Sequence, residues 1–127
     1  MEFAPEHIEE MIAHAREEAP DECCGLLAGR DGRSERVLRM TNAAHSPLRF
    51  QVDPLEVMRA LEAIDEAGLE VAALYHSHTR TAPYPSQTDV TYAEAWPGTP
   101  WIIVGLANGG DAEVRTYRID GSAVSEL

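Results

Sequence analysis

Apolar residues recur every three or four positions in residues 4–19, the spacing at which side chains share one face of an α-helix. Met11 and Ala15 belong to this apolar face. Most of the intervening positions are charged, so the segment predicts an amphipathic opening helix. His7 and His14 are placed near its polar side, and we expect both to face solvent.

Two further helices are marked by residues that start and stop helices. Asp53 can cap a helix that carries Pro54 at its first position and continues, with apolar residues at helical spacing, until Gly68. Ser86 begins a short third helix, which must end by Pro97 because proline cannot continue a helix.

Short apolar runs bounded by turn residues predict the strands. Residues 22–43 and residues 100–120 each read as a hairpin, the second turning at residues 109–111. Between them, residues 69–78 suit a central strand that ends at two histidines. The resulting order of elements predicts an α/β fold, with a mixed β-sheet flanked by helices in a single domain over residues 1–127.

Composition and net charge limit the classes of partner that are expected. A chain of 127 residues can bury a core without disulfides, and 44% apolar with 25% charged residues is typical of a soluble globular protein. The formal net charge of −12 repels phosphate groups, so neither nucleic acid nor a membrane surface is an expected partner. Because the start is acidic and no apolar run could span a bilayer, we expect a cytoplasmic protein.

The two cysteines, Cys23 and Cys24, are adjacent. Neighbouring residues of a strand point to opposite faces, so a disulfide within the chain is not expected. We interpret both as reduced, half-buried thiols, since free cysteine is among the most buried residue types.

Two histidines and an aspartate form the main chemical signal. His76 and His78 stand two apart at the end of a predicted strand, so both imidazoles leave the same face. Ser86 and Asp89 stand three apart where the next helix starts and share a face there. Two histidine nitrogens and one carboxylate oxygen are the three protein ligands of a catalytic zinc site, which leaves the fourth position for water.

Each half of this pattern also has a structural explanation. Ser86 and Asp89 are related to a capping box, and histidines often occur at strand ends. Both pairs in this order and spacing are rare by chance, which favours a metal site, and capping is compatible with catalysis at Ser86. The same ligands could hold another divalent ion in place of zinc.

Glu22 opens an apolar strand, which is an unfavourable place for a carboxylate that reaches no partner. It is a candidate proton acceptor beside the metal. An ordinary solvated charge at a strand end explains its position equally well.

The segments ExxGLL at Glu22 and HSHx(7)SxxD from His76 to Asp89 resemble the JAMM (MPN-type) zinc metallopeptidase family, over nearly the whole chain. The resemblance implies the JAMM/MPN fold, with a cytidine-deaminase-like layout. It also implies that His76, His78 and Asp89 hold one zinc ion, that Glu22 is the general acid and base, and that Ser86 supports the oxyanion.

The segments PDECCGLLAG, MTNAAHSP, YHSHTRTAPYPSQTDV and RTYRIDG are similar to a bacterial branch of this family. Members of that branch hydrolyse cysteine from the C-terminus of a small ubiquitin-like sulfur-carrier protein with a Gly-Gly tail, in cysteine biosynthesis. The resemblance implies such a carrier as partner. Many JAMM enzymes have proline after the second histidine, whereas this chain has Thr79, which fits the branch and leaves the ligands unchanged.

Alternative functions differ in what they require of the sequence. A zinc deaminase uses HxE and PCxxC motifs, and the sequence has neither. A non-catalytic MPN-type binding scaffold usually lacks the metal ligands, which are all present here. A JAMM isopeptidase that acts on ubiquitin-like conjugates or small peptides fits the same residues and stays open.

Overall fold

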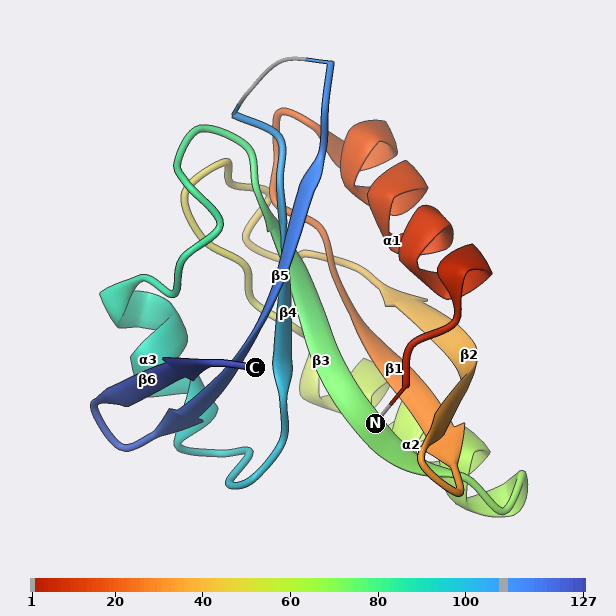
Figure 1. Ribbon diagram of the computed structural model, residues 1–127. Coiled ribbons are helices and arrows are strands. Elements are labelled where there is room, and N and C mark those ends of the chain that lie inside the picture. Colours follow the sequence, from red (N-terminus) through yellow and green to blue (C-terminus); the bar gives the residue numbers. More distant parts are fainter. Residues whose placement is uncertain (1, 108–109) are drawn as a thin grey trace.

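The computed structural model describes residues 2–107 and 110–127 and shows a twisted six-stranded β-sheet with helices on both faces (Figure 1). The strands are β1 (Cys24–Arg30), β2 (Arg33–Met40), β3 (Glu70–His78), β4 (Trp101–Gly105), β5 (Glu113–Asp120) and β6 (Ala123–Glu126). Their order in the sheet is β2-β1-β3-β4-β5-β6. The pair β3 and β4 is parallel and the other pairs are antiparallel, so the expected mixed sheet is confirmed.

The helices are α1 (Pro5–Glu18), α2 (Pro54–Glu66) and α3 (Gln87–Ala93). They divide the core into two layers. Met11 of α1 packs with Leu27 on one face of the sheet, whereas Ile64 of α2 and Ala93 of α3 pack with Leu74 on the other. Among the described residues, none of these helices is both long and apolar enough to cross a bilayer.

The predicted helices and the first five strands are confirmed. Asp53 caps α2 by accepting a hydrogen bond from Leu55 N at 2.8 Å, and Ser86 is the N-cap of α3. The predicted turn at residues 109–111 lies partly outside the described residues. The strand β6 was not predicted, because its four residues are mostly exposed and carry almost no apolar alternation.

The structure corrects the expectation that His14 faces solvent. Its side chain is buried, with 3% of the residue exposed, and its Nδ1 lies 2.7 Å from the Tyr75 hydroxyl. The position follows from helical spacing, because residues 11, 14 and 15 share the face that packs on the sheet. Burial lowers the pKa of His14 and outweighs the nearby Glu18 carboxylate, which lies 3.8 Å away.

The register of β3 places its last residues beside two other strands. In the sheet, Cys24 of β1 pairs with His76, and Gly105 of β4 pairs with His78. Gly25 pairs with Tyr75, and a Cβ on Gly25 would overlap the tyrosine ring. Only glycine therefore fits at position 25 of the ExxGLL segment.

Candidate metal centre

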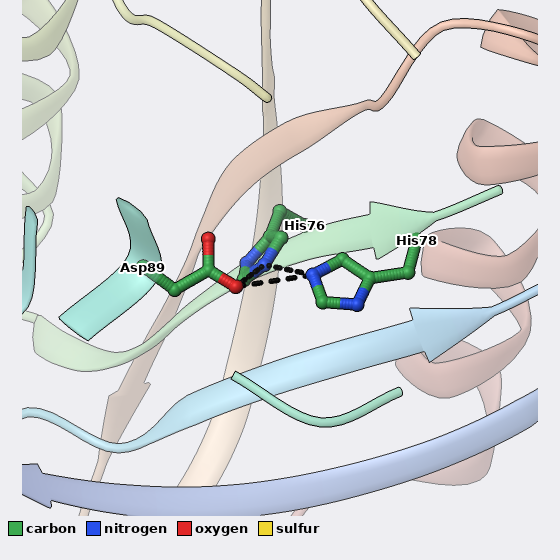
Figure 2. Close-up of side chains that lie close together, drawn as sticks. All are labelled: His76, His78 and Asp89. Carbon is green, nitrogen blue, oxygen red and sulfur yellow. Dashed lines mark hydrogen bonds and ion pairs between the residues drawn. The ribbon is translucent and has the colours of Figure 1, made fainter. Parts of the chain in front are cut away.

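Three polar side chains from β3 and α3 converge on one point (Figure 2). Asp89 Oδ2 lies 3.0 Å from His76 Nε2 and 3.0 Å from His78 Nε2, and the two nitrogens are 3.2 Å apart. All three residues are buried, with at most 3% exposed. The structure therefore brings together the three residues that the sequence predicts as metal ligands.

Local structure explains why Asp89 points at the histidines. Ser86 Oγ accepts a hydrogen bond from Asp89 N at 3.1 Å, and Ser86 N donates to Asp89 Oδ2 at 3.0 Å. This capping box orients the carboxylate at the start of α3. Burial alone would raise the pKa of Asp89, but the charge of His76, with hydrogen bonds from both imidazoles and from Ser86, holds it well below its ordinary value.

The second histidine is oriented by a backbone oxygen. His78 Nδ1 lies 2.9 Å from the backbone oxygen of Ala82, which can only accept a hydrogen bond. Nδ1 can therefore donate its proton to Ala82 O when Nε2, which lies 3.0 Å from Asp89 Oδ2, binds a metal ion. A hydrogen bond of this kind orients histidine ligands in many metal sites.

These residues fit a zinc ion. Tetrahedral ligand atoms at about 2.0–2.1 Å from zinc lie about 3.3 Å from one another. The separations of 3.0–3.2 Å between the three donor atoms are close to this value. Two imidazole nitrogens and one carboxylate oxygen are also the donor types that catalytic zinc prefers.

Glu22 is buried just before β1, with 4% of the residue exposed. Its Oε1 has no hydrogen-bond partner among the described residues. Burial is the largest cause that raises the pKa of Glu22 to about 7. The charge of His78 lowers this pKa, and the charge of Asp89 raises it. Glu22 is therefore not an ordinary solvated charge at a strand end, which was the alternative explanation of its position in the sequence. A pKa near neutrality suits a group that takes up and releases protons.

The backbone around Glu22 is fixed on both sides. Glu22 N donates to Ser46 O at 2.9 Å, and Asn42 Nδ2 donates to Glu22 O at 2.9 Å. The Thr79 hydroxyl donates to Pro20 O at 2.9 Å, which ties the end of β3 to the segment before Glu22. A proline at position 79 could not form this bond, so the hydroxyl gives the unusual threonine a structural role.

Sequence reasoning missed two residues of the site. Asn42 is buried and holds the loop between β2 and α2 against Glu22. Phe50, in the same loop, packs its ring 4.7 Å from the imidazole of His76, measured between centroids. A lone asparagine after a strand and a lone phenylalanine in a loop carry no periodic signal, so neither could be assigned without the tertiary contacts.

The cysteines are confirmed as free, and they are fully buried rather than half-buried, on opposite sides of the sheet. Burial raises the pKa of both thiols to about 12. A thiol with such a pKa is protonated at neutral pH and is a poor nucleophile or metal ligand. Cys23 and Cys24 therefore pack in the interior and do not extend the ligand set.

The profile of prokaryotic homologs of the JAB domain matches residues 4–120. The chain therefore belongs to this family, as the resemblance to the JAMM/MPN proteins predicts. The JAB1/MPN domain protein AF2198 from Archaeoglobus fulgidus has the same fold, with a TM-score of 0.67 at 20% identity, covering 100% of this chain and 94% of that protein.

Two curated relatives are similar at the level of sequence. The CysO-cysteine peptidase of Mycobacterium tuberculosis is 42% identical over 118 residues, which span 91% of this chain and 80% of the relative. The desampylase of Pyrococcus furiosus is 35% identical over 100 residues, which span 79% of this chain and 71% of the relative.

Proposed function

We propose that this chain is a zinc-dependent metallopeptidase that cleaves the amide bond between a small ubiquitin-like sulfur-carrier protein and a C-terminal cysteine. The coarser class, a hydrolase of the JAB family that acts on peptide or isopeptide bonds, rests on the named peptidase relatives. Beyond this class, we propose the zinc ion, the carrier with its Gly-Gly tail and the release of cysteine. We also propose that residues 1–127 form one JAMM/MPN domain.

The observation that carries this proposal is the convergence of three ligand atoms in one buried cluster, on the sheet face opposite α1. In the proposed site, His76, His78 and Asp89 hold the metal. A bound zinc ion would supply Lewis-acid chemistry, polarising the scissile carbonyl and lowering the pKa of water. The ligands come from rigid elements, which keeps the donor atoms in place during the reaction.

Glu22 is proposed as the general acid and base. Its unpaired Oε1 can accept a proton from the attacking water, and its pKa of about 7 allows it to pass that proton to the leaving amine. Ser86 is proposed to stabilise the oxyanion. Its Oγ accepts a hydrogen bond from Asp89 N, which leaves the hydroxyl proton free to be donated to substrate. One such donor is typically worth about 3 kcal/mol of barrier.

The choice of substrate is supported by the similarity to the mycobacterial relative, whose name specifies a CysO-cysteine adduct. The desampylase from Pyrococcus furiosus favours a second candidate, in which the same site cleaves conjugates of ubiquitin-like proteins. Both reactions need the same metal, base and oxyanion donor. They differ only in the leaving amine, so the substrate has to be decided by experiment.

The test is to incubate the purified protein with a carrier–cysteine adduct and a carrier–lysine isopeptide conjugate, with and without a chelator, and to follow intact masses. We expect the adduct to lose one cysteine only in the unchelated sample. The matched variant Glu22→Gln keeps all three ligands, so it should bind zinc normally and lose nearly all turnover. Cleavage of the isopeptide alone would favour the second candidate, and turnover in the chelated sample would refute the metallopeptidase.

A further inference from the structure

The segment between β3 and α3, residues 79–85, carries the backbone oxygen that orients His78. This oxygen belongs to Ala82 and accepts a second hydrogen bond, from Tyr84 N at 2.8 Å. The bond from Tyr84 N closes a three-residue turn centred on Pro83, and the bond from His78 reaches the same oxygen from β3. The direction of the Ala82 carbonyl therefore depends on where Pro83 is held.

Pro83 is buried and is held from two sides. The hydroxyl of Tyr117, a buried residue of β5, donates a hydrogen bond of 2.6 Å to Pro83 O. On the other side, the proline ring lies against Gly105 of β4. A Cβ on Gly105 would lie 2.9–3.0 Å from three atoms of that ring, so the glycine leaves the space that the proline fills.

Both contacts act next to the ligand. Gly105 is the residue that pairs with His78 in the parallel register of β3 and β4. Leu106 N, which follows it, donates to His78 O at 3.0 Å. The backbone of His78 is therefore fixed to the same strand that supports Pro83, and its imidazole is fixed by the turn that Pro83 forms.

We propose that Tyr117 and Gly105 are positioning residues for His78. They hold the turn at Pro83 so that the Ala82 carbonyl stays within hydrogen-bond distance of His78 Nδ1 and orients Nε2 towards the proposed metal. Neither residue touches the ligand atoms. The inference rests on the proposed metal site, because its consequence is a higher affinity for zinc.

The main variant is Tyr117→Phe, which removes the hydroxyl and keeps the ring. Loss of a hydrogen bond around a metal ligand typically costs 10-fold to 100-fold in metal affinity. Because Tyr117 acts through the turn, we expect the lower end, about a tenfold increase in the dissociation constant of zinc, measured by competition with a chromophoric chelator. Tyr84→Phe is the matched control, since Tyr84 stacks edge-on against Tyr117 but is 58% exposed. We expect it to bind zinc like the wild type.

A second measurement separates positioning from general destabilisation. In the zinc-free protein, the chemical shift and exchange rate of the His78 Nδ1 proton, measured by NMR, report the hydrogen bond from Nδ1 to Ala82 O. We expect a hydrogen-bonded, slowly exchanging Nδ1 proton in the wild type and in Tyr84→Phe, and faster exchange in Tyr117→Phe. Gly105→Ala, which displaces Pro83 from the other side, should produce the same change if Tyr117→Phe does not fold.

Unchanged zinc affinity together with an unchanged exchange rate of the His78 Nδ1 proton in a folded Tyr117→Phe or Gly105→Ala variant would overturn the inference and leave the proposed function intact. A wild-type protein that binds no zinc would instead refute the proposed function. In that case, the histidine signals of the zinc-free variants still decide whether Tyr117 and Gly105 position His78.

Discussion

Glu22 combines two properties that are costly for a carboxylate, burial and the absence of a partner for Oε1 among the described residues. A protein core normally excludes such a group, because removing a charge from water is unfavourable unless it is paired. Retaining this carboxyl in the interior is consistent with the proposed role, in which the missing partner is a proton of water or substrate. Proton transfer and stability therefore make opposite demands at this residue.

This conflict predicts how stability depends on pH in the zinc-free protein. The pKa of Glu22 is raised from 4.5 to about 7 in the folded state, so between these values the folded state holds a proton that the unfolded state has lost. The contribution of Glu22 to stability is therefore fully present below about pH 4.5 and is lost as the pH rises to about 7. One pKa unit corresponds to about 1.4 kcal/mol, so the loss is about 3 kcal/mol.

Glu22→Gln mimics the protonated carboxyl at every pH. The stability gained by this substitution should therefore increase by about 3 kcal/mol between acidic and mildly basic pH, as measured by urea unfolding in the presence of a chelator. Glu62→Gln, at an exposed position of α2, is the matched control and should show no such trend. A stability difference that does not change with pH would show that the Glu22 carboxyl is solvated in the folded protein.

The side chain of Asn42 makes several of the hydrogen bonds that hold the loop between β2 and α2. Asn42 Nδ2 donates to Glu22 O at 2.9 Å and to Arg49 O at 3.0 Å, while its Oδ1 accepts from Ala44 N and Gln51 N at 3.0 Å each. The loop also contains Ser46, which binds Glu22 N, and Phe50, which packs on His76. One amide thus joins the irregular segment to Glu22, the proposed base.

We expect Asn42→Ala to destabilise the protein by about 2–3 kcal/mol, because buried backbone groups lose their partners. Turnover should fall at least about tenfold as Glu22 loses its alignment. Zinc affinity should stay within about twofold of the wild type, since the ligands lie on β3 and α3. Urea unfolding, steady-state kinetics and chelator competition measure the three effects.

Asn42→Asp separates the two ends of the amide. It keeps an oxygen for Ala44 N and Gln51 N but places a carboxylate oxygen against Glu22 O and Arg49 O, so it should destabilise the protein at least as much as alanine and still reduce turnover. Full activity in both variants would show that the loop does not position Glu22.

At the scale of the whole molecule, the proposed metal would join two elements that the chain connects only by the segment of residues 79–85. His76 and His78 belong to β3, and Asp89 belongs to α3, which packs on the same sheet face as α2. The unfolded chain does not hold these donor atoms together, so zinc binds the folded state in preference. Binding should therefore stabilise the entire fold by mass action.

Zinc at about 100 times its dissociation constant should add about 2.7 kcal/mol to the free energy of unfolding. For a chain of 127 residues this corresponds to an increase in Tm of about 10 °C, which a chelator should abolish in a thermal scan. His78→Ala removes one ligand and should melt at the same temperature with and without chelator. A wild-type Tm that does not respond to zinc would contradict the metal site at these residues.

Local patterns in the sequence were sufficient for most of the fold and for the cluster of His76, His78 and Asp89, the proposed metal ligands. The three helices and five of the six strands follow from apolar spacing and from caps such as Asp53. The ligands were also predictable, because residues two apart on a strand and three apart on a helix share a face whatever surrounds them. Both kinds of rule act over a few residues.

Only the tertiary structure decided which polar groups are buried and what they contact. The contact of His14 with Tyr75, the hydrogen bond from Asn42 to Glu22 and the contact of Tyr117 with Pro83 join residues that are 20 to 61 positions apart in the chain. Desolvation and hydrogen-bond satisfaction depend on all the atoms around a group, which come from several elements at once. The sequence therefore determined where the ligands lie, and the packing of distant segments determined the environment in which they and Glu22 act.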